Sequence, residues 1–128
     1  MYRELTNGIE VVAEPAYVPE KSQPEKGVYF FAYQITITNR EMGMVQLRSR
    51  HWIITDGHGQ VHEVQGEGVV GEQPLLGNGE SFTYSSFCPL PTPTGNMRGT
   101  YTMEAVEEGQ SFRIRIPLFF LRADTGTA

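Results

Sequence analysis

GEGVVGEQPLLGNGESFTYSSFCPLPTPTGNMRGTYTM, the stretch from Gly66 to Met103, constrains the backbone path of the chain more than any other part. Glycines and prolines recur between short apolar runs, so no window is suited to a long helix. Asn78-Gly79 is a strong turn dipeptide, and Glu80 to Phe87 then alternate aromatic with hydroxyl side chains in the two-residue period of a strand. The stretch therefore predicts short strands joined by turns.

The same pattern continues on both sides of this stretch. Val28 to Asn39 (VYFFAYQITITN) is the clearest strand, and Pro15 interrupts the first one, which places it at a sheet edge or bulge. Strands are expected at residues 8–18, 28–39, 45–55, 61–65, 80–87, 97–103 and 111–121. This series is typical of an all-β, seven-stranded antiparallel β-sandwich of the immunoglobulin or fibronectin type III kind.

Length, charge and cysteine content restrict the class of protein. The 128 residues suit one domain over 1–128, and a net charge of −5 disfavours both nucleic acid and an anionic membrane as partners. Cys88 is the only cysteine, and no apolar run approaches membrane-spanning length. We therefore expect a cytoplasmic protein without an internal disulfide.

Gly66, Gly68 and Gly71 have the Gly-x-Gly-x-x-Gly spacing of phosphate-binding loops. A dinucleotide site of this kind needs a helix after the glycines, and the residues that follow, EQPLLGNG, contain two turn signals instead. No Lys or Arg occurs between His51 and Met97, although Arg48, Arg50 or Arg98 could fold over the loop. A structural bulge is the first interpretation, and an anion-binding loop is the alternative.

Three histidines fall within twelve residues, and two of them with Glu63 form a candidate metal site. If Gly57-His58 is a two-residue hairpin loop, His51 and His62 lie diagonally on one face of the hairpin and can share one ion with Glu63. A three-residue loop would put the two histidines on opposite faces. Surface histidines without a ligand are the other interpretation.

The last strand carries the clearest interaction signal. Phe112, Ile114, Ile116, Leu118 and Phe120 are expected to point inward by alternation. Pro117, Phe119 and Leu121 would then form an outward surface at an edge strand, suited to a protein partner or a homodimer. Packing against Tyr2 and Leu5 is the alternative.

Three further residues are expected to be structural. Trp52 anchors the core, and Tyr101 is a candidate tyrosine corner that ties a strand to a loop. Cys88 lies at a strand end without an evident base, which disfavours a nucleophile.

Six motifs together resemble the ApaG (CorD) family, a bacterial family whose domain also occurs in some eukaryotic F-box proteins and in a polymerase-delta-interacting protein. They are HWIITD at 51–56, GEGVVGEQP at 66–74, Gly79-Glu80-x-Phe82-x-Tyr84, CPLPTPTG at 88–95, Met97-x-Gly99-x-Tyr101-x-Met103 and Ile116-Pro117-x-Phe119-x-Leu121. Asn78-Gly79 stands where the family usually has Pro-Gly, and both pairs make tight turns.

The resemblance implies a fibronectin-type-III-like fold and an association with cobalt resistance and magnesium efflux. It implies no established catalytic activity, so no catalytic residue is carried over and no cofactor is expected. The resulting hypothesis is a non-enzymatic binding or regulatory module that acts through a protein partner. The alternative is a divalent-metal- or phosphate-binding protein that uses the His51 and His62 face or the Gly66–Gly71 loop.

Overall fold

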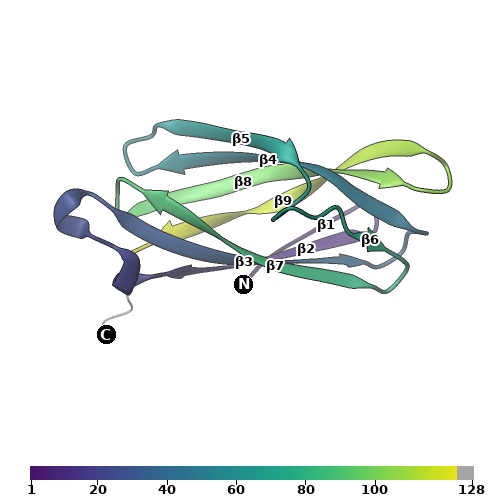
Figure 1. The fold of residues 1–128 in the computed structure, drawn as a ribbon, viewed down its shortest axis with the longest axis horizontal. Coiled ribbons are helices and arrows are strands. Elements are labelled where there is room, and N and C mark those ends of the chain that lie inside the picture. The colour runs from purple at the N-terminus through teal and green to yellow at the C-terminus, as the bar shows by residue number, and fades with distance from the viewer. Residues whose placement is uncertain (124–128) are drawn as a thin grey trace.

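The structure, a computed structural model, describes residues 1–123, and these form nine strands and two short 3-10 turns (Figure 1). The strands are β1 (Tyr2–Thr6), β2 (Ile9–Tyr17), β3 (Tyr29–Asn39), β4 (Val45–Asp56), β5 (Val61–Glu67), β6 (Leu75–Leu76), β7 (Ser81–Leu90), β8 (Thr94–Ala105) and β9 (Gln110–Arg122). The turns η1 (Pro19–Lys21) and η2 (Pro24–Lys26) connect β2 to β3.

Two antiparallel sheets face each other. One has the order β1-β2-β3-β7, and the other has the order β5-β4-β8-β9, with β6 paired to β4 (Figure 1). The predicted all-β antiparallel sandwich is confirmed. The seven predicted strands correspond to β2–β5 and β7–β9, and the two short strands β1 and β6 were not predicted.

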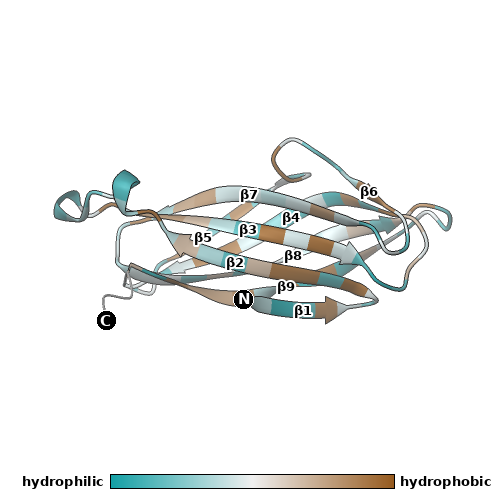
Figure 2. Cartoon of the chain, turned by 90° about the horizontal axis from the view of Figure 1, so that it is seen from below, coloured by the Kyte–Doolittle hydropathy of each residue, from teal (hydrophilic) through white to brown (hydrophobic). Residues whose placement is uncertain are grey.

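The core lies between the sheets, where alternate residues of each strand point inward. On β3, Phe31, Ile35 and Ile37 are fully buried, and brown and pale segments alternate toward the end of β3 in Figure 2. Trp52 is 2% exposed and packs edge-on against Tyr101 and Phe119, as expected of a core anchor. One continuous apolar core therefore holds the two sheets together.

A pair of tyrosine hydroxyls crosses this core. Tyr84 on β7 and Tyr101 on β8 belong to different sheets, and their hydroxyl oxygens are 2.5 Å apart in a buried hydrogen bond. Tyr101 therefore ties one sheet to the other, rather than tying a strand to a loop as predicted.

A β-bulge in β9 reverses the predicted orientation of its last residues. Ile116 pairs with Gly99 but Phe119 pairs with Met97, so Pro117 and Leu118 together oppose the single residue Arg98. Beyond the bulge, alternation is shifted by one residue. As a result Phe119 and Leu121 are buried, whereas Phe120 is 43% exposed and Leu118 46% exposed.

The predicted outward surface of Pro117, Phe119 and Leu121 is therefore wrong. All three residues are buried, because the extra residue of the bulge turns Phe119 and Leu121 toward the core. Phe119 packs against Tyr2, with ring centroids 6.1 Å apart. This contact is part of the alternative interpretation, in which the strand end packs against the N-terminal residues.

None of the described residues forms a helix that is long and apolar enough to cross a membrane.

Candidate functional site

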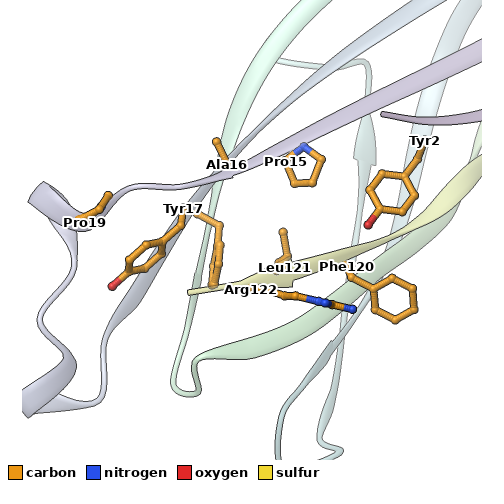
Figure 3. Close-up of a pocket in the computed structure, with 9 residues that line it drawn as sticks. Tyr2, Pro15, Ala16, Tyr17, Pro19, Phe120, Leu121 and Arg122 are labelled. Atoms are coloured by element: carbon orange, nitrogen blue, oxygen red, sulfur yellow. The ribbon is translucent and has the colours of Figure 1, made fainter. Parts of the chain in front are cut away.

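A hollow of about 660 Å³ opens at the end of the sandwich where β2 and β9 end (Figure 3). We call it the β2–β9 groove. In Figure 3, Pro15 lies above the hollow and Arg122 below it, with Tyr17 on one side and Tyr2 and Phe120 on the other. The full lining consists of Tyr2, Pro15, Ala16, Tyr17, Pro19, Phe31, Phe120, Leu121 and Arg122.

The groove exists because β1 covers only part of the edge of β2. The pairing between these strands runs from Thr6 opposite Ile9 to Tyr2 opposite Ala13. From Glu14 to Tyr17, β2 keeps its partner β3 on one side, and no strand of residues 1–123 pairs with it on the other. The hollow lies beside this uncovered part of β2, and the buried side chains of Phe31 and Leu121 form its floor.

The direction of the main-chain groups on β2 follows from one hydrogen bond. The Val18 N–H donates to the Phe30 carbonyl oxygen on β3 at 2.8 Å. Because main-chain groups alternate along a strand, Pro15 and Tyr17 direct theirs to the uncovered edge. Proline lacks an N–H, so Pro15 leaves no donor unpaired there. The carbonyls of Pro15 and Tyr17 and the N–H of Tyr17 remain for an added strand.

The floor of the groove is apolar, and its rim carries one positive charge. Phe31 and Leu121 are each 1% exposed and form the floor, and the Tyr17 ring packs on Phe31 with centroids 5.4 Å apart. The Arg122 guanidinium carbon lies 6.0 Å from the Phe120 ring centroid. Among the described lining residues, Arg122 is the only charged side chain. The groove is therefore suited to an apolar group that carries a carboxylate nearby.

The Gly66–Gly71 loop is a compact turn rather than a strand-to-helix junction. Its amides are largely engaged: Gly68 N–H donates to the Arg48 carbonyl at 2.8 Å, and Val69 and Glu72 exchange N–H···O bonds at 2.8 and 2.9 Å. The segment continues into β6 and the Gly77–Glu80 turn, so no helix N-terminus faces the glycines. Val69 is 1% exposed and belongs to the core.

Gly66 and Gly68 each lie so close to a neighbouring group that a side chain would collide with it. A Cβ at Gly66 would lie 2.8 Å from a guanidinium nitrogen of Arg50, and a Cβ at Gly68 would lie 2.4 Å from the Glu72 carbonyl oxygen. Arg50 donates to the carbonyls of Glu67 and Gly68, each at 3.0 Å. Of the three arginines considered as cover for the loop, Arg50 thus contacts its carbonyl oxygens. This geometry supports the structural interpretation of the motif.

The histidines are separated by the hairpin register. Asp56 N–H donates to the Gln60 carbonyl, and the Asp56 carboxylate accepts from the amides of His58 and Gln60 at 2.8 and 3.0 Å. The loop therefore has three residues, Gly57 to Gly59, and of the two registers left open by the sequence the chain adopts the one that separates the histidines.

His51 consequently lies on one face with Glu63, at 2.7 Å between Nε2 and Oε1. His62 pairs with Ile54 on the opposite face, where its Nε2 is 3.9 Å from the Asp56 carboxylate. The described part of the chain contains no group of three His, Cys, Asp or Glu that could hold a metal ion. The set of His51, His62 and Glu63 is therefore divided by its own backbone.

One cysteine and three tyrosines of the core are held in their neutral forms. Burial raises the pKa of Cys88 to about 11, so the thiol is protonated at neutral pH and weakly nucleophilic. Burial also raises the pKa values of Tyr33, Tyr84 and Tyr101 above the usual 10.0. These groups stabilise the core in the protonated state.

The groove residues were not identified as a site from the sequence. Tyr17 on β2 is far in sequence from Phe120 and Arg122 on β9. Phe120 and Arg122 also follow the bulge, and strand alternation alone does not reveal a bulge. Pro15 was the one available signal, because a proline within a strand indicates an edge.

Comparisons with known proteins agree on one family. The model of the ApaG domain family matches residues 19–105. Protein ApaG of Methylobacterium sp. (strain 4-46) is 57% identical over 121 residues, which cover 94% of this chain and 92% of the relative. Protein ApaG of Rhodopseudomonas palustris (strain TIE-1) is 52% identical over 126 residues, covering 98% and 96%.

A solved structure shows the same likeness. The crystal structure of the putative ApaA protein from Bordetella pertussis superposes with a TM-score of 0.88 and is 51% identical, covering 91% of this chain and 94% of the other. The motifs, the sandwich and these relatives agree, and the chain belongs to the ApaG domain family.

Proposed function

We propose that this chain is a non-enzymatic protein-interaction module that binds an extended peptide segment in the β2–β9 groove. The observation that carries the proposal is the combination of an uncovered strand edge with an apolar hollow of about 660 Å³ beside it. Peptide-binding domains commonly use this combination, because main-chain hydrogen bonds supply affinity and a pocket for a side chain supplies specificity.

The groove chemistry restricts the segment that fits. An extended peptide beside β2 can use the N–H of Tyr17 and the carbonyls of Pro15 and Tyr17. One of its large apolar side chains would pack against Tyr17 and Phe120, which line the hollow, and an Asp or Glu near that side chain would pair with Arg122. The expected motif is therefore an aromatic or branched apolar residue with a carboxylate one or two positions away.

Selection from a random peptide library displayed on phage tests this function. The wild-type chain should enrich the apolar–acidic motif, and synthetic peptides with that motif should bind Phe120→Ser at least about tenfold more weakly. Arg122→Glu should bind them more weakly still and favour peptides with a basic residue in place of the acidic one.

Leu118→Ser is the matched control for Phe120→Ser. Both residues are on β9 and have nearly equal exposure, 46% and 43%, but Leu118 does not line the groove. Equal loss of binding in the two variants, or enrichment of no motif by the wild type, would remove the proposal.

Divalent-metal binding is a second candidate function, supported by the contact between His51 Nε2 and Glu63 Oε1 at 2.7 Å. Imidazole and carboxylate together suit Co²⁺. Calorimetric titration of Co²⁺ into metal-free chain tests it, and heat that persists unchanged in His51→Ala contradicts it. The Gly66–Gly71 loop as a phosphate site is the weaker form of this alternative, since the amides of Gly68, Val69 and Glu72 already have acceptors.

The association with cobalt resistance and magnesium efflux, which the family resemblance implies, is compatible with an interaction module. A module that binds a segment of another protein can affect ion transport without holding the ion. A cytoplasmic location, expected from the single cysteine, belongs to this proposal as well.

A further inference from the structure

The two sheets end in four edge strands, and natural proteins protect such edges against pairing with other chains. The edges are β1 and β7 in one sheet and β5 and β9 in the other, with β6 beside β4 on the β5 side. Charged side chains, prolines, bulges and covering segments are the usual protection, because an edge presents unpaired N–H and C=O groups.

Three of the four edges carry this protection. β1 includes Arg3 and Glu4, and β5 includes Glu63 and Glu67. β9 carries its arginines and the bulge at Pro117, and its Arg115 N–H donates to the Thr6 hydroxyl of β1 at 3.2 Å.

β7 carries less of this protection, since of the kinds named above it has one proline, Pro89, next to its end. Its ten residues, SFTYSSFCPL, contain no charged side chain, and it pairs regularly with β3 without a bulge. Within residues 1–123, no other strand pairs with it. Phe87 on this strand is 52% exposed.

The main-chain groups that face outward on β7 can be assigned from one hydrogen bond. The Asn39 N–H donates to the Glu80 carbonyl at 2.9 Å, so even-numbered residues of this segment direct their groups toward β3. Ser81, Thr83, Ser85 and Phe87 therefore direct their N–H and C=O groups to the open edge. Pro89 also faces outward, where its missing N–H leaves no donor unpaired.

We propose that β7 pairs in antiparallel fashion with β7 of a second copy of this chain, which joins two four-stranded sheets into one continuous sheet. A twofold axis through Tyr84 would set Ser81 opposite Phe87 and Thr83 opposite Ser85, so that all the outward N–H groups find acceptors. Each Tyr84 side chain stays in its own core, where it bonds Tyr101.

A second copy fits this edge because its own β7 brings the same uncharged strand to it. The chain has a net charge of −5, so most of its surfaces repel a second copy. At the β7 edge the paired strands bring no like charges together, because neither strand has any. The interface is independent of the β2–β9 groove, since no groove residue lies on β7.

Sedimentation equilibrium over a dilution series tests the pairing. The wild type should approach twice the monomer mass of 14.4 kDa at high concentration. Ser85→Lys, which places a charge at an exposed position of the edge, should remain a monomer throughout. Gln65→Lys is the matched control, because Gln65 is an exposed residue of the edge strand β5, and this variant should dimerise like the wild type.

Hydrogen exchange supplies a second readout that a folding defect would not imitate. In the dimer the amides of Ser81, Thr83, Ser85 and Phe87 should be protected, and in Ser85→Lys the other three should exchange rapidly while Phe82 and Tyr84 stay protected through β3. A wild type that is monomeric at every concentration overturns the proposal. A dimer that Ser85→Lys leaves intact overturns it equally.

Discussion

Two tyrosine hydroxyls form a buried polar contact inside an otherwise apolar core. Tyr84 and Tyr101 come from opposite sheets, and Tyr101 is fully buried. Removing one hydroxyl leaves the other without its partner, whereas removing both leaves no unpaired group. A single substitution therefore costs more free energy of unfolding than the hydrogen bond itself contributes.

A double-mutant cycle measures this coupling. Tyr84→Phe and Tyr101→Phe should each lower the free energy of unfolding by about 1–3 kcal/mol, and the double variant should lose clearly less than the sum. Urea denaturation of the four proteins gives the coupling energy. Additive losses would show that the two hydroxyls act independently.

Gly68 and Gly71 share a left-handed backbone but differ in their surroundings. Their φ angles are +65° and +81°, so a side chain strains the backbone at either position. A Cβ at Gly68 would also collide with the Glu72 carbonyl, whereas nothing lies within 4 Å of a Cβ at Gly71.

Gly68→Ala should therefore destabilise the chain more than Gly71→Ala. We expect a loss of about 1 kcal/mol from the left-handed backbone at Gly71, and a further loss from the collision at Gly68. Thermal unfolding of both variants makes the comparison. Equal losses would show that the loop relaxes around Gly68 and that its path is not fixed by that contact.

At the scale of elements, β9 shows how one inserted residue decides which side chains form the core. Before the bulge Ile114 and Ile116 face inward, and after it Phe119 and Leu121 do. The aromatic neighbours Phe119 and Phe120 therefore have opposite environments, 0% and 43% exposed.

Substitution of these neighbours tests the reversal. Phe119→Ala should cost about 3–5 kcal/mol because it empties a packed site beside Trp52 and Tyr33, and Phe120→Ala should cost less than about 1 kcal/mol. Urea denaturation of both variants decides between the two registers. The reverse order of losses would restore the uninterrupted alternation and place Phe119 outside.

The same element shows where sequence periodicity stops being informative. β3 was predicted nearly to its ends, because its apolar and polar residues alternate over eleven residues. β4 was predicted with similar bounds, although a bulge between Leu47 and Ser49 interrupts its alternation. A bulge does not change the composition of β9, so the period alone could not place it. The loop at Gly57 to Gly59 allowed either of two registers, and the histidine set depended on that choice.

The short strands β1 and β6 and the β2–β9 groove could not be predicted from the sequence for a related reason. β1 has five residues and β6 two, too few for a period to be recognised. The β2–β9 groove depends on where β1 stops covering β2, so it could not be located without β1. Turns rather than a helix were predicted after the GEGVVGEQP segment, and the structure confirms this with β6 and the Gly77–Glu80 turn.

For the whole molecule, the core contains groups that ionise only at alkaline pH. Cys88 has a pKa of about 11 in the folded chain against a usual value of 9.0, and burial also raises the pKa values of three tyrosines above 10.0. An acid whose pKa is raised by folding gives up its proton first in the unfolded chain. The contribution of these groups to the free energy of unfolding is therefore complete below pH 9 and is lost as the pH rises above it.

The alkaline limb should have two parts with separate origins. Between pH 9 and 11 the Cys88 thiol should remove on the order of 2 kcal/mol of unfolding free energy, and above pH 10 the buried tyrosines should add to the loss. Cys88→Ala removes the first part and leaves the second, so its urea-unfolding free energy should stay flat to about pH 10 and then fall. Tyr84→Phe should keep the loss that begins at pH 9 and reduce the loss above pH 10 without abolishing it, because Tyr33 and Tyr101 remain. If both variants follow the wild-type curve, the alkaline loss arises outside the core, from the further negative charge that a chain with a net charge of −5 gains as the pH rises.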